Sequence, residues 1–89
     1  MKSVVAPRFW KLLNALPSEV QLLARKNHRL WREDSRHPSL RFRRLEDRGD
    51  LYTVRVGEHY RALGSLDGDT ITWVWIGSHA EYDRLTSSK

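Results

Sequence analysis

Apolar residues in the first third of the chain recur with the spacing of an α-helix. One stripe at positions i, i+3, i+4 and i+7 consists of Phe9, Leu12, Leu13 and Leu16. Pro7 suits the first turn of a helix, and Pro17 stops it. Ser18 with Gln21 forms a capping-box pattern that begins a second helix, which runs to about Asp34. Its buried face is expected to contain Val20, Leu23, Ala24, Leu30 and Trp31. The front of the chain is therefore predicted to form an αα-hairpin.

From residue 40 onward the apolar spacing changes to two, or close to it. Such runs occupy residues 40–45, 51–56, 60–66 and 69–76, and residues 2–6 form a further candidate strand. Short turns between the last three runs are typical of an antiparallel meander. Gly77 ends the last run, and Ser78 with Glu81 forms another capping box, which predicts a short helix to about Leu85. We expect an α+β fold in which a twisted antiparallel sheet of about four strands packs on the αα-hairpin.

The first turn of the meander sets which residues oppose each other. A three-residue loop at 57–59 pairs Val56 with Tyr60, and it therefore places Arg55 opposite Arg61. Like charges opposed on neighbouring strands cost about 0.2–1 kcal/mol, which an anion between them would offset. The alternative is that both arginines extend into solvent or find acidic partners. The register thus predicts a candidate anion site on the sheet.

The second turn is predicted at Asp67-Gly68, a two-residue hairpin signal. This turn would pair Leu66 with Asp69, and therefore Ala62 with Trp73. With the first register, one face then gathers Tyr52, Val54, Val56, Tyr60, Ala62, Ile71, Trp73 and Trp75, and is predicted to face the core. The other face gathers Thr53, Arg55, Arg61, Ser65, Thr70 and Thr72, with Leu51, Leu63, Val74 and Ile76 among them.

Composition narrows the class of protein. A chain of 89 residues with four Trp and three Tyr is expected to be one globular domain, residues 1–89. It lacks cysteine, a membrane-spanning apolar run and a secretory signal pattern, so we expect a cytoplasmic protein without a membrane partner. No histidine pair has convincing metal-ligand spacing, and neither a Gly-rich phosphate loop nor a Ser-centred nucleophile motif is present. No metal or cofactor is expected.

The charge is unevenly distributed along the chain. The overall formal charge is +5, but residues 1–45 carry eleven basic and three acidic residues, and residues 46–89 carry five basic and eight acidic residues. An arginine-rich basic half favours a phosphate-bearing partner, although a solvated surface explains the charge equally well. The run Arg41, Arg43 and Arg44 is a candidate for gripping a nucleic-acid backbone. Its alternative is an edge strand kept soluble by charge.

The start of the predicted last helix supplies candidate acid–base groups. His79 would be the first helical residue, and Tyr82 would lie three residues on, on the same side. A helix N-terminus offers free N–H groups and a partial positive charge, which suit a phosphate and favour a neutral histidine that can act as a base. Taken alone, His79 would more often be an incidental surface residue. Combined with Arg55 and Arg61, it is a candidate for holding and cleaving a phosphodiester.

Three segments together resemble the RelE/ParE toxin superfamily. These are residues 51–64 (LYTVRVGEHYRALG), 75–85 (WIGSHAEYDRL) and 37–42 (HPSLRF). The resemblance covers nearly the whole chain and implies a RelE-like microbial RNase fold. It also implies a toxin of a type II toxin–antitoxin pair that is neutralised by a small antitoxin protein wrapping it.

In RelE-like members of the superfamily, the activity is mRNA cleavage in the ribosomal A site. The RNA 2′-OH attacks the neighbouring phosphate without a metal, which requires a base, an acid and cations. By resemblance, Arg55 and Arg61 match the strand cations, and His79 and Tyr82 match the region of the C-terminal catalytic residues. Thr53 departs from the pattern, because some relatives carry a lysine there, and the C-terminal pair is also spaced differently from several relatives. A ParE-like gyrase inhibitor and a noncatalytic basic module that binds RNA or a protein remain the alternatives.

Overall fold

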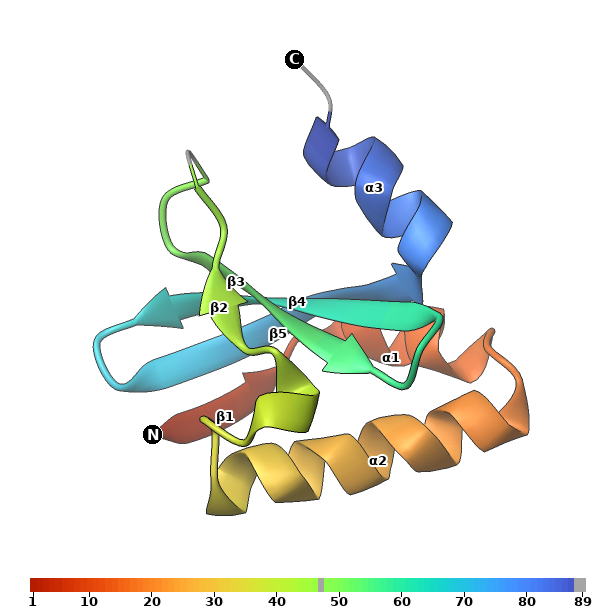
Figure 1. The fold of residues 1–89 in the computed structure, drawn as a ribbon, viewed down its shortest axis with the longest axis horizontal. Helices are drawn as coiled ribbons and strands as arrows, with labels where there is room; N and C mark the ends of the chain where they lie inside the picture. Colours follow the sequence, from red (N-terminus) through yellow and green to blue (C-terminus); the bar gives the residue numbers. More distant parts are fainter. Residues whose placement is uncertain (47, 88–89) are drawn as a thin grey trace.

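The computed structural model describes residues 1–46 and 48–87 as an α+β fold (Figure 1). In chain order its elements are β1 (Lys2–Val5), α1 (Pro7–Asn14), α2 (Ser18–Glu33), the 3-10 turn η1 (Pro38–Leu40), β2 (Arg43–Arg44), β3 (Leu51–Val56), β4 (Tyr60–Asp67), β5 (Thr70–Ser78) and α3 (His79–Ser87). The predicted fold class, αα-hairpin and C-terminal helix are confirmed. Asp47, Ser88 and Lys89, which the expected single domain includes, lie outside the described residues.

The sheet has five strands in the order β1-β5-β4-β3-β2. Strands β2 to β5 are antiparallel to their neighbours, whereas β1 pairs with β5 in parallel. The expectation of about four antiparallel strands was therefore incomplete, because β1 joins the far edge of the sheet. The predicted run at 40–45 shortens to β2, since Leu40 lies in η1 and Arg41 has a left-handed backbone (φ +48°) that interrupts an extended chain.

The register between β3 and β4 is confirmed, but the register between β4 and β5 was predicted wrongly. Asp67 pairs with Thr70, so the two-residue turn is Gly68-Asp69 rather than Asp67-Gly68. A bulge between Leu63 and Gly64 then shifts the pairing again. Gly64 has no Cβ atom, and one placed there would lie 2.7 Å from the Ile71 side chain. The glycine lets the strands approach closely, and the irregularity reverses which face later residues occupy.

The bulge exchanges two residues between the faces of the sheet. Ile76 pairs with Ala62 and is buried, whereas Trp75 pairs with Leu63 on the opposite face. The prediction that Trp75 faces the core and Ile76 faces away was therefore wrong. The buried core contains Leu13, Trp31, Leu40, Val54, Val56, Ala62, Ile71, Trp73 and Ile76.

Helices cover the two faces of the sheet unequally. Helices α1 and α2 lie on the core face, and α3 rises from the end of β5 on the opposite side (Figure 1). The predicted capping box at Ser18 is not formed, because Pro17 occupies the N-cap position and the Gln21 side chain donates to the Leu16 carbonyl instead. Within the described part of the chain, no helix has the length and apolar character needed to cross a bilayer.

Candidate phosphate-binding site

Two arginines face each other at the centre of the face beside α3. Arg55 on β3 pairs directly with Arg61 on β4, as the loop at 57–59 predicts. The alternation of each strand places both away from the core residues Val54 and Ala62. The Arg55 Nε atom donates to the Gly57 carbonyl at 2.9 Å, which holds its side chain along its own strand. The predicted juxtaposition of the two cations is thus present.

One nitrogen of the Arg61 guanidinium lacks a hydrogen-bond partner. Its Nη1 atom is buried without a hydrogen-bond partner, and its Cζ atom lies 5.4 Å from the ring centroid of Tyr82. Burial lowers the pKa of Arg61 below its ordinary value, and the nearby charges of Arg43, Arg55 and Arg41 lower it further, while Tyr82 acts in the opposite direction. The guanidinium stays charged, because its pKa lies far above neutrality. A partly buried cation repelled by its neighbours is stabilised by a bound anion.

The basic run at 41–44 divides between the two faces. Arg43 pairs with Thr53, so it lies on the same face as Arg55 and Arg61, and Arg41 acts on the pKa of Arg61 from the turn before β2. Arg44 instead pairs with Tyr52, and its Nη1 atom donates to the Gly49 carbonyl at 3.4 Å. The structure therefore brings Arg41 and Arg43 to the candidate site and leaves Arg44 outside it. We call Arg41, Arg43, Arg55 and Arg61 the arginine cluster.

The arginine cluster has no acidic counterpart among the described residues. The ion pairs His59 with Glu58 and His79 with Asp83 do not involve an arginine of the cluster. No group of three or more metal-ligating side chains occurs in the described part of the chain. The uncompensated charge suits an anionic ligand that arrives from outside.

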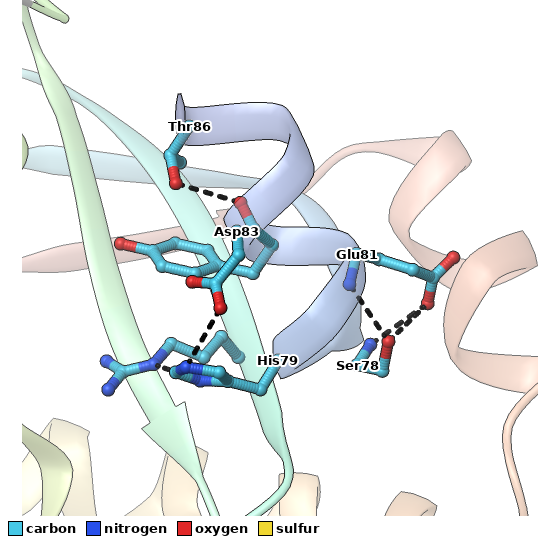
Figure 2. Close-up of polar contacts among 7 residues, drawn as sticks. Ser78, His79, Glu81, Asp83 and Thr86 are labelled. Carbon is cyan, nitrogen blue, oxygen red and sulfur yellow. Dashed lines mark hydrogen bonds and ion pairs between the residues drawn. The ribbon is translucent and has the colours of Figure 1, made fainter. Parts of the chain in front are cut away.

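His79 lies at the edge of the cluster, where β5 passes directly into α3. Its Nδ1 atom accepts a hydrogen bond from the Arg61 Nε atom at 3.4 Å, and its Nε2 atom lies 3.4 Å from the Asp83 carboxylate (Figure 2). Its ring centroid is 6.0 Å from that of Tyr82. The four predicted residues Arg55, Arg61, His79 and Tyr82 are therefore neighbours in space. Asp83 was not predicted as a site residue, although its position four residues after His79 on a predicted helix was a usable signal.

The backbone amides at the start of α3 are hydrogen-bonded within a capping box and do not form a free anion-binding site. The Ser78 Oγ atom accepts from the Glu81 amide at 3.1 Å, and the Glu81 carboxylate accepts from the Ser78 amide at 3.0 Å (Figure 2). These bonds from the Ser78 backbone and hydroxyl lower the pKa of Glu81. The His79 amide donates to the His59 carbonyl at 2.7 Å. The capping box was predicted correctly, but three amides that it could have offered to a phosphate are already engaged.

Tyr82 and Thr53 are both more buried than a reactive group exposed to substrate would be. Tyr82 is 6% exposed, and the Arg61 guanidinium lies over its ring. Thr53 is fully buried, and its hydroxyl oxygen has no hydrogen-bond partner. Some relatives in the resembled superfamily carry a lysine at this position, and here Arg43 on the neighbouring strand lies directly opposite it.

Comparisons with known proteins agree with this architecture. The family model of the ParE-like toxin domain matches residues 18–84. No curated protein matches the chain. RelE from the RelB-RelE antitoxin-toxin complex of Methanococcus jannaschii is 20% identical, with a TM-score of 0.73 over 91% of this chain and 96% of that chain. The isolated RelE toxin of E. coli is 15% identical, with a TM-score of 0.66 over 97% and 96%.

A third structure shares the fold at still lower identity. The YoeB/ParE toxin from Agrobacterium tumefaciens is 13% identical, with a TM-score of 0.69 over 89% of this chain and 99% of that chain. At these identities the structural likeness establishes the fold, and the family match supplies the relationship. The chain therefore belongs to the ParE-like toxin domain family, within the RelE/ParE toxin superfamily.

Proposed function

We propose that this chain is a ribosome-dependent endoribonuclease toxin that cleaves mRNA by attack of an RNA 2′-OH on the adjacent phosphate. The observation that carries the proposal is Arg61, whose buried Nη1 atom lacks a partner while three further arginines act on its pKa. Such a cluster binds a dianionic transition state more strongly than a monoanionic phosphodiester. That difference in affinity is what lowers the barrier of the reaction.

The arginine cluster would hold the phosphate and its developing charge. Arg61 provides a positive charge from β4, and Arg55 approaches from the opposite strand. Arg43 lies beside Thr53, so it supplies a cation where some relatives place a lysine. Arg41 extends the positive surface toward the next nucleotide, and a basic track of this kind favours a polyanionic chain over a small anion.

His79 is the group best placed to act as the base. Its ring lies beside the Arg61 side chain, so a phosphate held by Arg61 brings the neighbouring 2′-OH toward the imidazole. The role of Tyr82 is to support Arg61, because its ring lies under the guanidinium and is almost fully buried. The proton for the leaving 5′ oxygen then comes from solvent or from the ribosome rather than from this helix.

An antitoxin protein is the expected partner in addition to the ribosome and mRNA. Two of the similar structures are RelB-RelE complexes from archaea, and a third is the RelBE2 complex of Mycobacterium tuberculosis. In those complexes the toxin is held by its antitoxin. We extend this arrangement to the present chain, which would act in the cytoplasm where ribosomes are found.

Mapping mRNA 5′ ends after inducible expression tests the proposal. The wild-type chain should arrest growth and produce cuts phased with codons inside translated reading frames. Arg61→Ala and His79→Ala should abolish these cuts while the proteins keep the circular dichroism spectrum of the wild type. Arg44→Ala is the matched control, because it removes an arginine that the structure places outside the cluster.

Two results would overturn the proposal. Growth arrest with intact mRNA and induced DNA damage would assign the chain to gyrase inhibition on the same scaffold. Absence of any toxicity in the wild type would favour a noncatalytic basic module. Loss of folding in Arg61→Ala would show that Arg61 is structural, and Arg61→Lys, which keeps a cation but loses the guanidinium fork, then separates charge from packing.

A further inference from the structure

Helix α2 carries one polar residue in the stripe that faces the sheet. The stripe has the spacing i, i+3, i+4, i+7 and i+11, and it consists of Val20, Leu23, Ala24, Asn27 and Trp31. Asn27 is the polar member, and together with the core residues it lines the apolar cavity between the two N-terminal helices and the sheet. An amide in such surroundings is expected to have a specific hydrogen-bond partner.

The partner of Asn27 is the backbone of the arginine cluster. The Asn27 Nδ2 atom donates to the Arg55 carbonyl at 3.0 Å. Strand β2 pairs with Tyr52 and Thr53 of β3 and, among the described residues, does not extend to Arg55. The amide therefore supplies at this edge of β3 the donor that a neighbouring strand would otherwise provide.

The direction of this carbonyl also determines how closely the two central arginines approach. A carbonyl that points to the outer edge of β3 points away from β4, so Arg55 and Arg61 form a pair without mutual backbone hydrogen bonds. The bond from the Leu66 amide to the Asp50 carbonyl agrees, because the two kinds of pair alternate along the two strands from there. Side chains in such pairs lie closer together than in hydrogen-bonded pairs.

A second contact from α2 supports the side chain of Arg55. The Arg55 Nε atom donates to the Gly57 carbonyl at 2.9 Å. Gly57 has a left-handed φ of +65°, and a Cβ atom there would overlap the side chain of Leu23, so Leu23 lies directly against this turn. Leu23 and Asn27 are one helical turn apart. One side of α2 therefore contacts both the Arg55 carbonyl and the turn to which the Arg55 side chain is bonded.

We propose that Asn27 is a positioning residue that, from the core side of the sheet, holds Arg55 in the orientation that binds the scissile phosphate. The inference rests on the proposed function and concerns a residue outside the arginine cluster. Asn27 does not contact RNA; it fixes the backbone of β3 where the Arg55 side chain begins. The guanidinium is thereby placed before the phosphate arrives, and such preorganisation favours the transition state.

The competing explanation is a bond that stabilises the fold and does nothing more. A side-chain amide that satisfies an edge carbonyl adds to stability wherever it occurs. Gln21 is the matched control, because its Nε2 atom donates to the Leu16 carbonyl at 2.9 Å and so joins the same helix to the segment after α1 instead of to β3. The experiments must therefore measure Arg55 itself, not stability alone.

Relaxation of the arginine side-chain ¹⁵Nε nuclei measures the mobility of Arg55 in the full chain without RNA. We expect the ¹H–¹⁵N heteronuclear NOE of the wild-type Arg55 Nε to be close to that of the backbone amides. Asn27→Leu, which is similar in size but has no donor, should lower this NOE, whereas Gln21→Leu should leave it unchanged. Asn27→Ala replaces Asn27→Leu if the latter does not fold. A mobile Arg55 Nε in wild type would overturn the inference without any variant.

Single-turnover cleavage of mRNA at saturating ribosomes provides a double-mutant cycle between Asn27 and Arg55. Asn27→Leu should lower the maximal rate about tenfold, because a displaced cation stabilises the transition state less. The apparent affinity should stay within about twofold of wild type, since no charge is removed. In an Arg55→Ala background, Asn27→Leu should have no further effect on the rate. An equal loss in both backgrounds would show that Asn27 does not act through Arg55.

The two measurements separate failure of the inference from failure of the proposed function. If wild type cleaves RNA and Asn27→Leu cleaves it equally fast, the inference is wrong and the nuclease stands. If wild type cleaves no RNA, the nuclease is wrong and the role of Asn27 in cleavage falls with it. The NMR result then still decides whether Asn27 holds Arg55 in place.

Discussion

The guanidinium of Arg61 lies 5.4 Å from the ring centroid of Tyr82, and that ring is 6% exposed. A cation over an aromatic face gains on the order of 1 kcal/mol, more where water is excluded. Tyr82 therefore helps to fix the position of Arg61, whose Nη1 atom is buried and unpaired. The contact joins Tyr82, the buried residue of α3, to the candidate anion site on the sheet.

Replacing Tyr82 separates support of Arg61 from proton donation. Tyr82→Phe keeps the ring, so we expect RNA cleavage within about threefold of wild type, a difference below 1 kcal/mol. Tyr82→Leu removes the ring and should lower cleavage about tenfold as Arg61 loses its support. Single-turnover cleavage rates check both. A loss of about a hundredfold or more in Tyr82→Phe would instead assign the hydroxyl as the general acid.

Arg43 and Arg44 are neighbours in sequence that should differ in their effect on RNA binding. Arg43 lies on the face of the arginine cluster, whereas Arg44 bonds to the Gly49 carbonyl. Arg43→Ala should reduce the slope of log affinity against log salt by about one, as expected for one lost phosphate contact. Arg44→Ala should leave the slope unchanged. Equal slopes for the two variants would contradict the assignment of Arg43 to the site.

The stability of the fold should fall as the pH drops, because of His28. The Trp73 Nε1–H donates to the Ser3 hydroxyl at 3.0 Å, and that hydroxyl lies 2.8 Å from the His28 Nε2 atom, which can accept only when neutral. Burial, and secondly the charge of Arg32, lower the pKa of His28 below its ordinary value of 6.5. The unfolded chain therefore takes up the proton first. The stability that neutral His28 contributes is complete above about pH 6.5 and is lost as the pH falls toward the pKa of His28 in the folded state.

Urea denaturation at a series of pH values measures this effect. In His28→Gln the free energy of unfolding should vary less between neutral and mildly acidic pH than in wild type. His59→Gln is the control, because the side chain of His59 is 84% exposed. An unchanged pH profile in His28→Gln would show that another group governs the acid sensitivity.

Gly57 should be the least replaceable of the turn glycines. Its φ of +65° is left-handed, and a Cβ atom there would overlap the side chain of Leu23 on α2. Gly68 has a φ of +63° with open space around it, so it shares the strain without the overlap. Gly68→Ala should cost about 1–2 kcal/mol of unfolding free energy, and Gly57→Ala roughly 1–3 kcal/mol more. Chemical denaturation compares the two, and equal losses would mean that Leu23 moves aside freely.

Turn chemistry explains which parts of the sheet could be predicted from the sequence. The loop at 57–59 fixed the pairing of Arg55 with Arg61, because a three-residue connection with a left-handed glycine leaves little choice of register. The pairing of β4 with β5 could not be obtained in this way. Gly64 hints at a bulge, but the partner that crowds it, Ile71, becomes visible only once the strands are packed.

The candidate site was predictable where local rules govern it. The capping box at Ser78 located the start of α3, and with it the positions of His79 and Tyr82. The same spacing would have identified Asp83. The burial of Tyr82 and the lack of a hydrogen-bond partner for the Arg61 Nη1 atom depend on how α3 packs against the sheet. The pattern of residues along the sequence does not encode that packing.

Strand β5 ends at Ser78 and α3 begins at His79, without a connecting loop. The direction in which each α3 side chain points around the helix axis is therefore set by the orientation of the last residue of β5. One residue added at this junction would turn every later side chain by about 100° around the helix axis and carry the imidazole off the sheet. Extra residues at the hairpin tip between β4 and β5 would leave the orientation of the α3 side chains unchanged. The junction is thus the place where chain length, rather than residue identity, decides whether the imidazole and the guanidinium meet.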